Sequence, residues 1–182
     1  PSADTIKFST GGVERMQITN SGVTGTGVGG KFASYAVICD QKGTNDSGGS
    51  TSTGTFNTRD LNTELVDDDN IVSISSNQFT LQAGTYLIRA HAPAYKAARH
   101  QILIWNATDS SIAAVGTSEF SEISSNIVTR SFAQGRATIG AAKAFEIRHR
   151  VGYGVTTYGF GVESNYDLQP SIYTVVEIYK ES

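Results

Sequence analysis

Polar and apolar residues alternate with a period of two along this sequence, and this alternation limits the folds open to it. The segment FEIRHRV, residues 145–151, places Phe, Ile, His and Val at odd positions and Glu, Arg and Arg at even ones. A strand that buries one face has this pattern. Strong helix formers do not recur at i, i+3, i+4 and i+7 over three turns, and Ser, Thr, Gly and Val dominate instead. The sequence therefore predicts an all-β fold.

Other short apolar runs follow one another at the spacing typical of β-sandwiches and barrels. Turn residues such as Asn77, Gly84 and Gly140 separate them. We therefore predict a two-sheet antiparallel β-sandwich of jelly-roll type. The predicted strands besides 145–151 are Phe32–Cys39, Ile71–Ile74, Phe79–Leu81, Tyr86–Ala92, Ile102–Trp105, Ile112–Val115, Ile127–Phe132 and Ile172–Tyr179.

Length and charge exclude several classes of protein. The 182 residues suit one domain of about 150 residues and a short appendage. Charged residues make up 17% of the chain and the net charge is -3, so no basic field favours nucleic acid. No apolar run approaches the ~20 residues of a membrane span, so no membrane insertion is expected. The first residue is Pro1 rather than Met, which indicates a piece of a longer polypeptide.

Three predicted strands are apolar or aromatic on both faces: those around Tyr86–Ala90, Ile102–Trp105 and Ile172–Tyr179. In a two-sheet monomer one of these faces would meet water, so a second copy of the chain is expected to cover it. The alternative is that the tyrosines simply lie on the surface. The interface residues predicted on this basis are Trp105, Tyr173, Val175 and Tyr179.

Two segments break the strand rhythm. Asp40–Thr55 is rich in Gly, Ser and Thr, so we expect an exposed, mobile loop. Gly152–Ser171 mixes glycines with aromatic residues, and it either packs its rings down as a lid or presents them to a ligand. Aromatic faces stack on sugar rings at a low entropic cost. The predicted ligand contacts are Tyr153, Tyr158, Phe160 and Tyr166, with packing as the alternative for each.

The first 30 residues differ from the rest. VERMQITNSGV indicates one short strand followed by a turn at residues 20–22, too little to bury its apolar side chains without partner chains. TIKFSTGGVERMQITNSGVTGTG, from Thr5 to Gly27, resembles the strand repeats that precede C-terminal domains in bacteriophage tail-fibre and other fibrous virion proteins. We therefore divide the chain into a fibre stalk with a Gly-rich joint, 1–30, and a head, 31–182.

The head resembles the complement globular heads and the tumour-necrosis-factor-like ligands. The resemblance rests on FTLQAGTYLIRAHA at Phe79–Ala92, FEIRHRVG at Phe145–Gly152 and the closing SIYTVVEIY. It implies a jelly roll of about ten strands, a tight homotrimer, and a binding surface built from loops. The Tyr/Gly-rich loop, and the lack of a collagen-like repeat before the head, depart from the animal members and leave an animal-type partner in doubt.

No motif for catalysis or metal binding stands out. The sequence has no G-x-S-x-G elbow, and only Glu119 and Glu122 could form a glycosidase pair. His91, His100 and His149 lack zinc spacing, although a trimer could repeat one of them about its axis. Cys39 lies in an apolar run, as expected of a buried, inert thiol. We expect no enzymatic activity, no cofactor and no metal.

These observations predict a trimeric head of a virion fibre, acting outside the cell. It would bind a glycan or protein of the host surface, most simply a saccharide, and attach to other virion fibre proteins. The alternative is a head that only nucleates and caps the trimeric fibre, with host recognition elsewhere.

Overall fold

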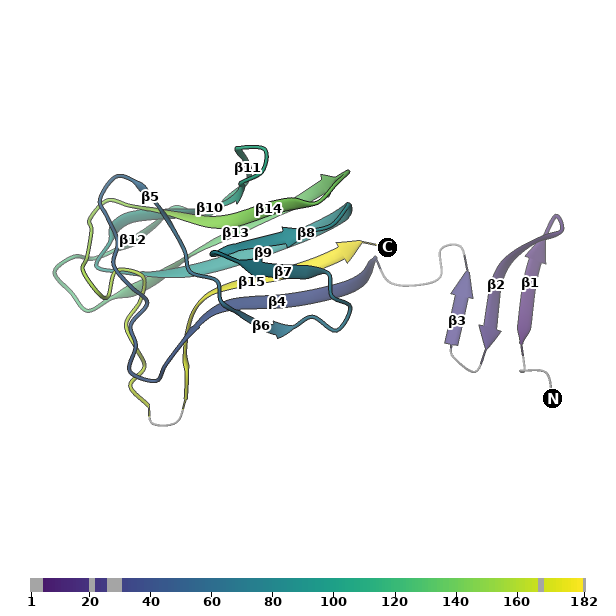
Figure 1. Cartoon of the computed structure of the whole chain (residues 1–182), viewed down its shortest axis with the longest axis horizontal. Helices are drawn as coiled ribbons and strands as arrows, with labels where there is room; N and C mark the ends of the chain where they lie inside the picture. The colour runs from purple at the N-terminus through teal and green to yellow at the C-terminus, as the bar shows by residue number, and fades with distance from the viewer. Residues whose placement is uncertain (1–4, 20–21, 26–30, 167–168, 182) are drawn as a thin grey trace.

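The computed structural model describes residues 5–19, 22–25, 31–166 and 169–181. These residues form antiparallel sheets and contain no helix, which confirms the predicted all-β fold class. Two sheets face each other in the head and a third, smaller sheet is formed by the N-terminal residues (Figure 1). No helix in the described part of the chain is long and apolar enough to cross a membrane.

The first sheet of the head has five strands in the order β13-β9-β15-β4-β6. β15 lies at its centre, paired in antiparallel fashion with β4 on one side and β9 on the other. The strands are β4 (Phe32–Lys42), β6 (Thr63–Val66), β9 (Gly84–Tyr95), β13 (Val128–Ile139) and β15 (Ser171–Glu181).

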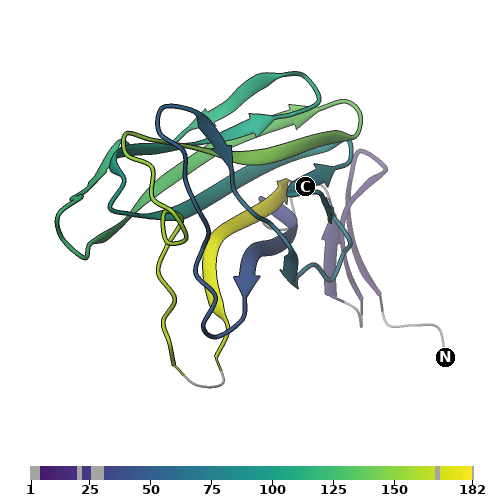
Figure 2. The same cartoon turned by 60° about the vertical axis from the view of Figure 1, so that its left-hand side comes forward.

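The second sheet has seven strands, and Figure 2 shows it stacked on the first. Its main order is β11-β10-β14-β8-β7, while β12 pairs with β10 and β5 pairs with β14. The strands are β5 (Phe56–Thr58), β7 (Val72–Ser75), β8 (Gln78–Leu81), β10 (Ala98–Asn106), β11 (Ser111–Val115), β12 (Glu119–Ser121) and β14 (Lys143–Val151).

The core lies between the two sheets and is built by strand alternation. β9 points Tyr86 and Ile88 inward, and β14 points Phe145 and Ile147 toward them, all at most 1% exposed. The ring of Phe145 stacks on that of Phe79 with centroids 5.6 Å apart. Each such side chain contributes roughly 1.5–3 kcal/mol by leaving water. The core therefore depends on the period-two pattern from which the fold was predicted.

Every strand predicted from the sequence is present. Three short strands of the head were missed, namely β5, β6 and β12, which have three or four residues each. They lie at the margins of the sheets, and none of their apolar side chains is buried. A short strand held by one neighbour carries too little periodic signal to be predicted from sequence.

The N-terminal sheet has the order β1-β2-β3, with β1 (Ile6–Thr10), β2 (Val13–Thr19) and β3 (Gly22–Gly25). The sequence predicted β2 but not β1. The two are joined at Gly11 and Gly12, whose φ angles of 60° and 76° fit a tight hairpin turn. The first two residues of the predicted 20–22 turn lie outside the described residues. The large apolar residues exposed on this sheet are Ile6, Phe8, Val13, Ile18 and Val23.

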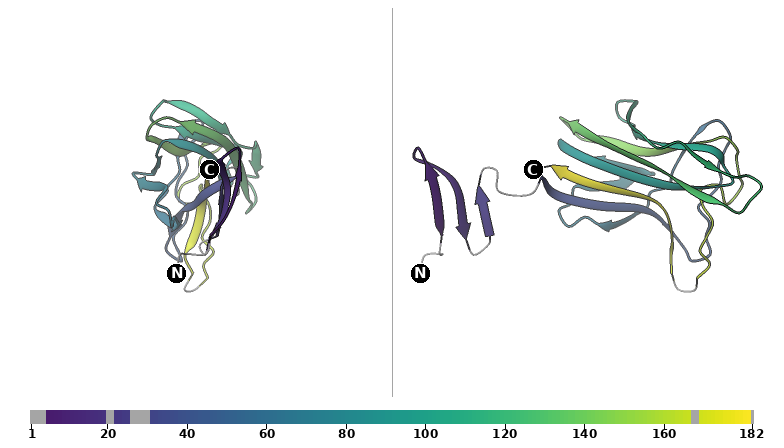
Figure 3. Two further views of the ribbon diagram at one scale, coloured as in Figure 1. Left: turned by 90° about the vertical axis from the view of Figure 1, so that its right-hand side faces the viewer. Right: turned by 180° about the vertical axis from the view of Figure 1, so that it is seen from behind.

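The long strands fix which segments share an end of the head. The start of β4 and the end of β15 lie together, next to the C-terminus (Figures 1 and 3). The loop after β4 and the loop before β15 lie at the opposite end. The two segments that break the strand rhythm in the sequence are thus neighbours in space.

Candidate functional site

The outward side of the five-stranded sheet is a broad, partly apolar surface, called here the free face. Ile38, Ile88 and Val176 point into the core, so the residues next to them in each strand point the other way. Tyr35 remains 50% exposed and Phe132 53% exposed. The free face consists of Tyr35, Val37, Leu87, Arg89, His91, Phe132, Val175, Glu177 and Tyr179.

An aromatic cluster occupies one end of the free face. The ring of Tyr179 lies with its centroid 5.3 Å from that of Phe32 and 6.3 Å from that of Tyr35. Leu87 is the cross-strand partner of Tyr179 on β9. Val175 lies further along β15, opposite His91. Two of the four predicted interface residues, Val175 and Tyr179, therefore share this surface.

Two arginines on and beside the free face pair with carboxylates of the same chain. The Arg89 guanidinium lies 3.2 Å from the Glu177 carboxylate. At the sheet margin, Arg136 donates two hydrogen bonds of 2.8 Å to Glu181, and this lowers the pKa of Glu181. A partner covering such pairs would bury few unpaired charges, whose burial is costly.

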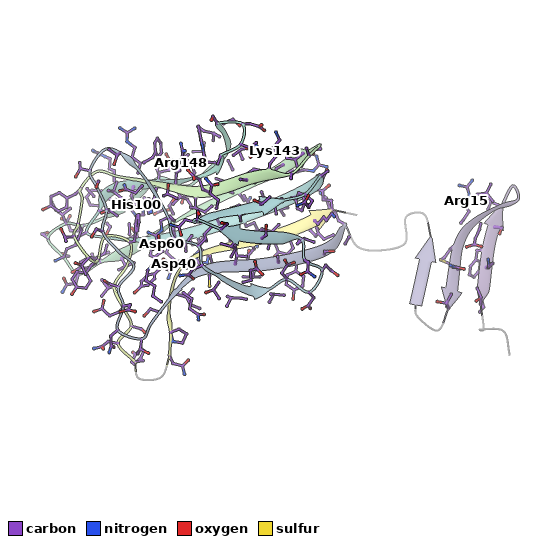
Figure 4. The ribbon with its side chains drawn as sticks, in the orientation of Figure 1. Arg15, Asp40, Asp60, His100, Lys143 and Arg148 are labelled. Atoms are coloured by element: carbon purple, nitrogen blue, oxygen red, sulfur yellow. The ribbon has the colours of Figure 1, made fainter. Side chains whose placement is uncertain are left out.

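The other two predicted interface residues are not exposed on the free face. Trp105 lies on the outer face of the seven-stranded sheet, beneath the Arg148 guanidinium at 4.0 Å from its ring centroid (Figure 4 labels Arg148). Tyr173 is only 3% exposed, and its hydroxyl donates to the Asp46 carbonyl at 2.7 Å. Both side chains already have partners within one chain.

The predicted ligand contacts divide into one buried ring and three exposed ones. Tyr153, Tyr158 and Tyr166 are 51%, 41% and 74% exposed, whereas Phe160 is 6% exposed. The Tyr158 ring meets the Tyr95 ring edge to face at 6.4 Å. The loop thus packs one ring inward and leaves three tyrosines at the surface, and their contact with a ligand stays a prediction.

The loop 40–55, which we expected to be exposed, is exposed or partly exposed over most of its length but not throughout. Gly48 N–H donates to the Gly161 carbonyl at 2.9 Å, and Thr51 N–H donates to the Val155 carbonyl at 2.9 Å. Asp40 and Thr51 are buried. A Cβ at Gly48 would lie 2.7 Å from the backbone of Phe160, so the two loops approach as closely as glycine allows. Hydrogen bonds to the Tyr-rich loop hold the loop 40–55 in place, although it has few apolar side chains to pack into a core.

Arg59 is fully buried beneath these loops and holds them by hydrogen bonds. Its guanidinium donates to Thr174 Oγ1 at 2.7 Å and to the carbonyls of Pro93 and Phe160 at 3.1 and 3.0 Å. It also lies 3.9 Å from the centroid of the Phe160 ring. Desolvation lowers the pKa of Arg59 to about 9, and Asp40 is the first of the charges that oppose this shift. No sequence pattern marks this arginine as buried.

Asp40 supplies the nearby negative charge (Figure 4). Its side chain is fully buried, and Lys42 Nζ lies 3.1 Å from Oδ1. The same ammonium group lies 2.6 Å from Asp60. Burial raises the pKa of Asp40, against the opposing effect of Lys42. The arrangement is a charged layer that ties the start of the 40–55 loop to the sheet.

His100 and His149 form a buried pair that the sequence treated as two isolated residues. His100 Nδ1 lies 3.0 Å from His149 Nε2, and His100 Nε2 lies 2.7 Å from Thr129 Oγ1. Desolvation lowers the pKa of His100 to about 4 and that of His149 well below its usual value. Both imidazoles are therefore neutral at pH 7. The alternation in β10 and β14 indicates that both histidines point inward. It does not show that they touch, because that depends on how the two strands are aligned.

The remaining candidates give no metal or redox site. Cys39 is fully buried as expected, and desolvation raises the pKa of its thiol. Within the described ranges, no group of three or more His, Cys, Asp or Glu side chains is placed to hold a metal ion.

The sequence matches no protein-family model and no curated protein. The structure is similar to the globular domain of zebrafish complement 1qA, with a TM-score of 0.52 and 12% identity over 80% of this chain and 95% of that one. It is also similar to murine APRIL at pH 8.0, with a TM-score of 0.51 and 6% identity over 81% and 98%. The head has the jelly-roll fold of these proteins. At such low identity the similarity establishes the fold and leaves function to the chain's own residues.

Proposed function

We propose that this chain forms the homotrimeric head of a virion fibre, of the kind bacteriophages carry, and binds a saccharide on the host surface. The observation that carries the proposal is the free face with its aromatic cluster of Phe32, Tyr35 and Tyr179. An exposed, partly apolar face of this kind suits burial against further copies of the same chain.

The N-terminal sheet supports a fibre. Five large apolar residues lie exposed on three short strands, and such a sheet is marginal in water unless a second layer covers it. Three parallel copies of the chain would supply that layer in the stalk and in the head at once. The resemblance of Thr5–Gly27 to virion fibre repeats agrees with this arrangement.

The receptor contacts are proposed to lie on the loops at the end of the head away from the C-terminus. Tyr153, Tyr158 and Tyr166 present partly exposed rings there, and Phe160, which is buried, is left out of the contact set. Each site would be weak, and three copies could raise avidity by about 10²–10⁴.

Three measurements test the proposal. Light scattering should give a mass of about three times the 19.4 kDa of one chain, and a monomer would contradict it. A glycan array probed with the trimer, and adsorption to a panel of bacterial hosts, should give specific hits. Tyr153→Ala or Tyr166→Ala should then weaken adsorption by about tenfold at an almost unchanged melting temperature, if that ring contributes about 1.4 kcal/mol.

The second candidate is a head that only trimerises and caps the fibre. The burial of Phe160 and the Tyr95–Tyr158 contact favour it, because they show that part of the aromatic loop is used for packing. A stable trimer without any glycan hit or host adsorption would select this candidate.

A further inference from the structure

A groove of about 700 Å³ lies on the outer face of the seven-stranded sheet, near the end that carries the loops. Its floor is formed by neighbouring residues of β10 and β14, where Gln101 pairs with Arg150. β12 borders it on one side and β5 on the other. The groove opens on the sheet opposite the free face, so assembly through the free face would leave it accessible.

Two phenylalanine rings stand at opposite sides of this groove. Phe120 on β12 is the cross-strand partner of Arg99, and Phe56 on β5 is the cross-strand partner of Arg150. The two rings are 53% and 49% exposed, so both present an aromatic face to the groove's surroundings. Exposed aromatic rings beside a polar floor suit a ring-shaped ligand with one apolar face and several hydroxyls.

The charges of the groove favour an anion. Arg99 and Arg150 are both exposed, and in the part of the chain that the structure describes neither has a carboxylate at ion-pair distance. The other nearby charge is Glu119, which accepts a hydrogen bond from Thr117 Oγ1 at 2.8 Å. The groove thus carries two positive guanidinium groups and one negative carboxylate. The planar fork of arginine matches a carboxylate with two parallel hydrogen bonds.

We propose that this groove binds a carboxylate-bearing saccharide, with Arg99 and Arg150 on the carboxylate and Phe56 and Phe120 against the sugar rings. Gln101 is held in place on the floor, since its amide nitrogen donates to the Gly116 carbonyl at 2.7 Å. Its amide oxygen has no hydrogen bond within the described chain, which leaves it as an acceptor for a sugar hydroxyl. The inference deepens the proposed function, on which its choice of a saccharide rests, and adds this groove to the tyrosine loop as a second receptor contact.

Calorimetric titration of the full chain tests the assignment with trigalacturonate and sialyllactose as probes. Their neutral counterparts are the methyl ester of trigalacturonate and lactose. At least one acidic probe should bind, and its neutral counterpart should bind about tenfold more weakly, as expected for loss of a charge-assisted hydrogen bond. Absence of binding by both acids, or equal binding by the neutral sugars, overturns the proposal. A hexaglutamate peptide that binds as tightly as the sugar also overturns it.

Variants locate the site. Arg99→Gln and Arg150→Gln should each weaken the acidic probe by about tenfold while leaving the weak binding of its neutral counterpart unchanged. Phe120→Ala should weaken both. Arg15→Gln on β2 is the matched control, since it removes the same charge from the N-terminal sheet (Figure 4), and it should change nothing. Wild-type affinity in both groove variants would place the site elsewhere.

Cell adsorption separates this inference from the proposed function. If the trimer adsorbs to host cells and Arg99→Gln and Arg150→Gln adsorb equally well, the groove assignment fails and the attachment function stands. If the acidic sugar binds in the groove but no host cell is recognised, the attachment function fails and the groove assignment stands.

Discussion

The N-terminal sheet and the head differ in the number of sheet layers available to remove apolar side chains from water. In the head, β9 and β14 point Ile88 and Ile147 toward each other from two sheets, and each is at most 1% exposed. In the N-terminal sheet, Phe8 and Val13 belong to a single layer and remain 47% and 54% exposed. One chain thus completes the head core but leaves the N-terminal sheet without a core.

The free face shows that the head shares part of this need. Tyr35 and Phe132 are as exposed as the apolar residues of the N-terminal sheet, although Ala36 and Ala133 beside them in the same strands are buried. The two regions therefore differ in what they require of further copies. In the proposed assembly, another copy would give the N-terminal sheet a core, whereas in the head it would cover a surface outside a finished core.

The largest expected effect comes from placing a charge on the free face. Tyr179→Asp and Val175→Asp should each dissociate the trimer, because an unpaired buried charge costs several kcal/mol. Light scattering at micromolar concentration measures this. Trp105→Ala is the control: its ring lies on the other sheet beneath Arg148, so the trimer should persist. Intact trimers in both Asp variants would show that the free face is not the interface.

A smaller loss is expected inside the head, at the buried arginine. Arg59→Met removes three hydrogen bonds and leaves the carbonyls of Pro93 and Phe160 buried without that donor. A cost of about 3–5 kcal/mol should lower the melting temperature by roughly 10 °C. Arg99→Met, at an exposed position, should shift it by no more than about 2 °C. Equal shifts would mean that the loops do not depend on Arg59.

The histidine pair predicts an acid-sensitive head. The unfolded chain takes up protons near pH 6.5, whereas folded His100 resists them down to about pH 4. Between these values the unfolded state binds more protons, so stability is full above pH 6.5 and falls as the pH falls toward 4. The melting temperature should drop by roughly 5–10 °C between pH 7 and pH 4.5.

The raised pKa of Asp40 acts in the opposite direction over part of this range, so the absolute drop does not isolate the histidines. The double variant His100→Asn with His149→Asn provides the comparison. Its melting temperature at pH 7 is immaterial; its dependence on pH should be clearly flatter than that of the wild type. Identical slopes would assign the acid sensitivity to carboxylates.

The sequence predicted what depends on local pattern and missed what depends on register. The alternation in 145–151 located β14 and its buried face, because parity alone decides which side chains point inward. It could not pair His149 with His100, since that contact depends on how β14 is aligned with β10. Nor could it mark Arg59 as buried, because its acceptors come from three distant segments.

The same distinction explains the predicted site residues. Val175 and Tyr179 lie on the outward face of β15, which the local argument from a strand apolar on both faces predicts; their place in an interface stays a prediction. Tyr173 is buried within one chain, because an irregularity in the pairing of β15 with β4, between Ile172 and Val175, changes which residues face outward. Phe160 lies against Arg59, and composition alone could not separate it from the exposed tyrosines of its loop.

The smallest expected effect tests the comparison between the two regions most directly. Deleting residues 1–30 removes the N-terminal sheet, whose strands hydrogen-bond only with one another among the described residues. The head keeps its core and its free face, so it should remain a trimer with a melting temperature within about 3 °C of the full chain. Differential scanning calorimetry and light scattering measure the two properties. A head that becomes monomeric would show that the stalk residues hold the copies together and that the free face alone is insufficient. A head that no longer folds would show that the two regions share one core, which would remove the basis for dividing the chain at residue 30.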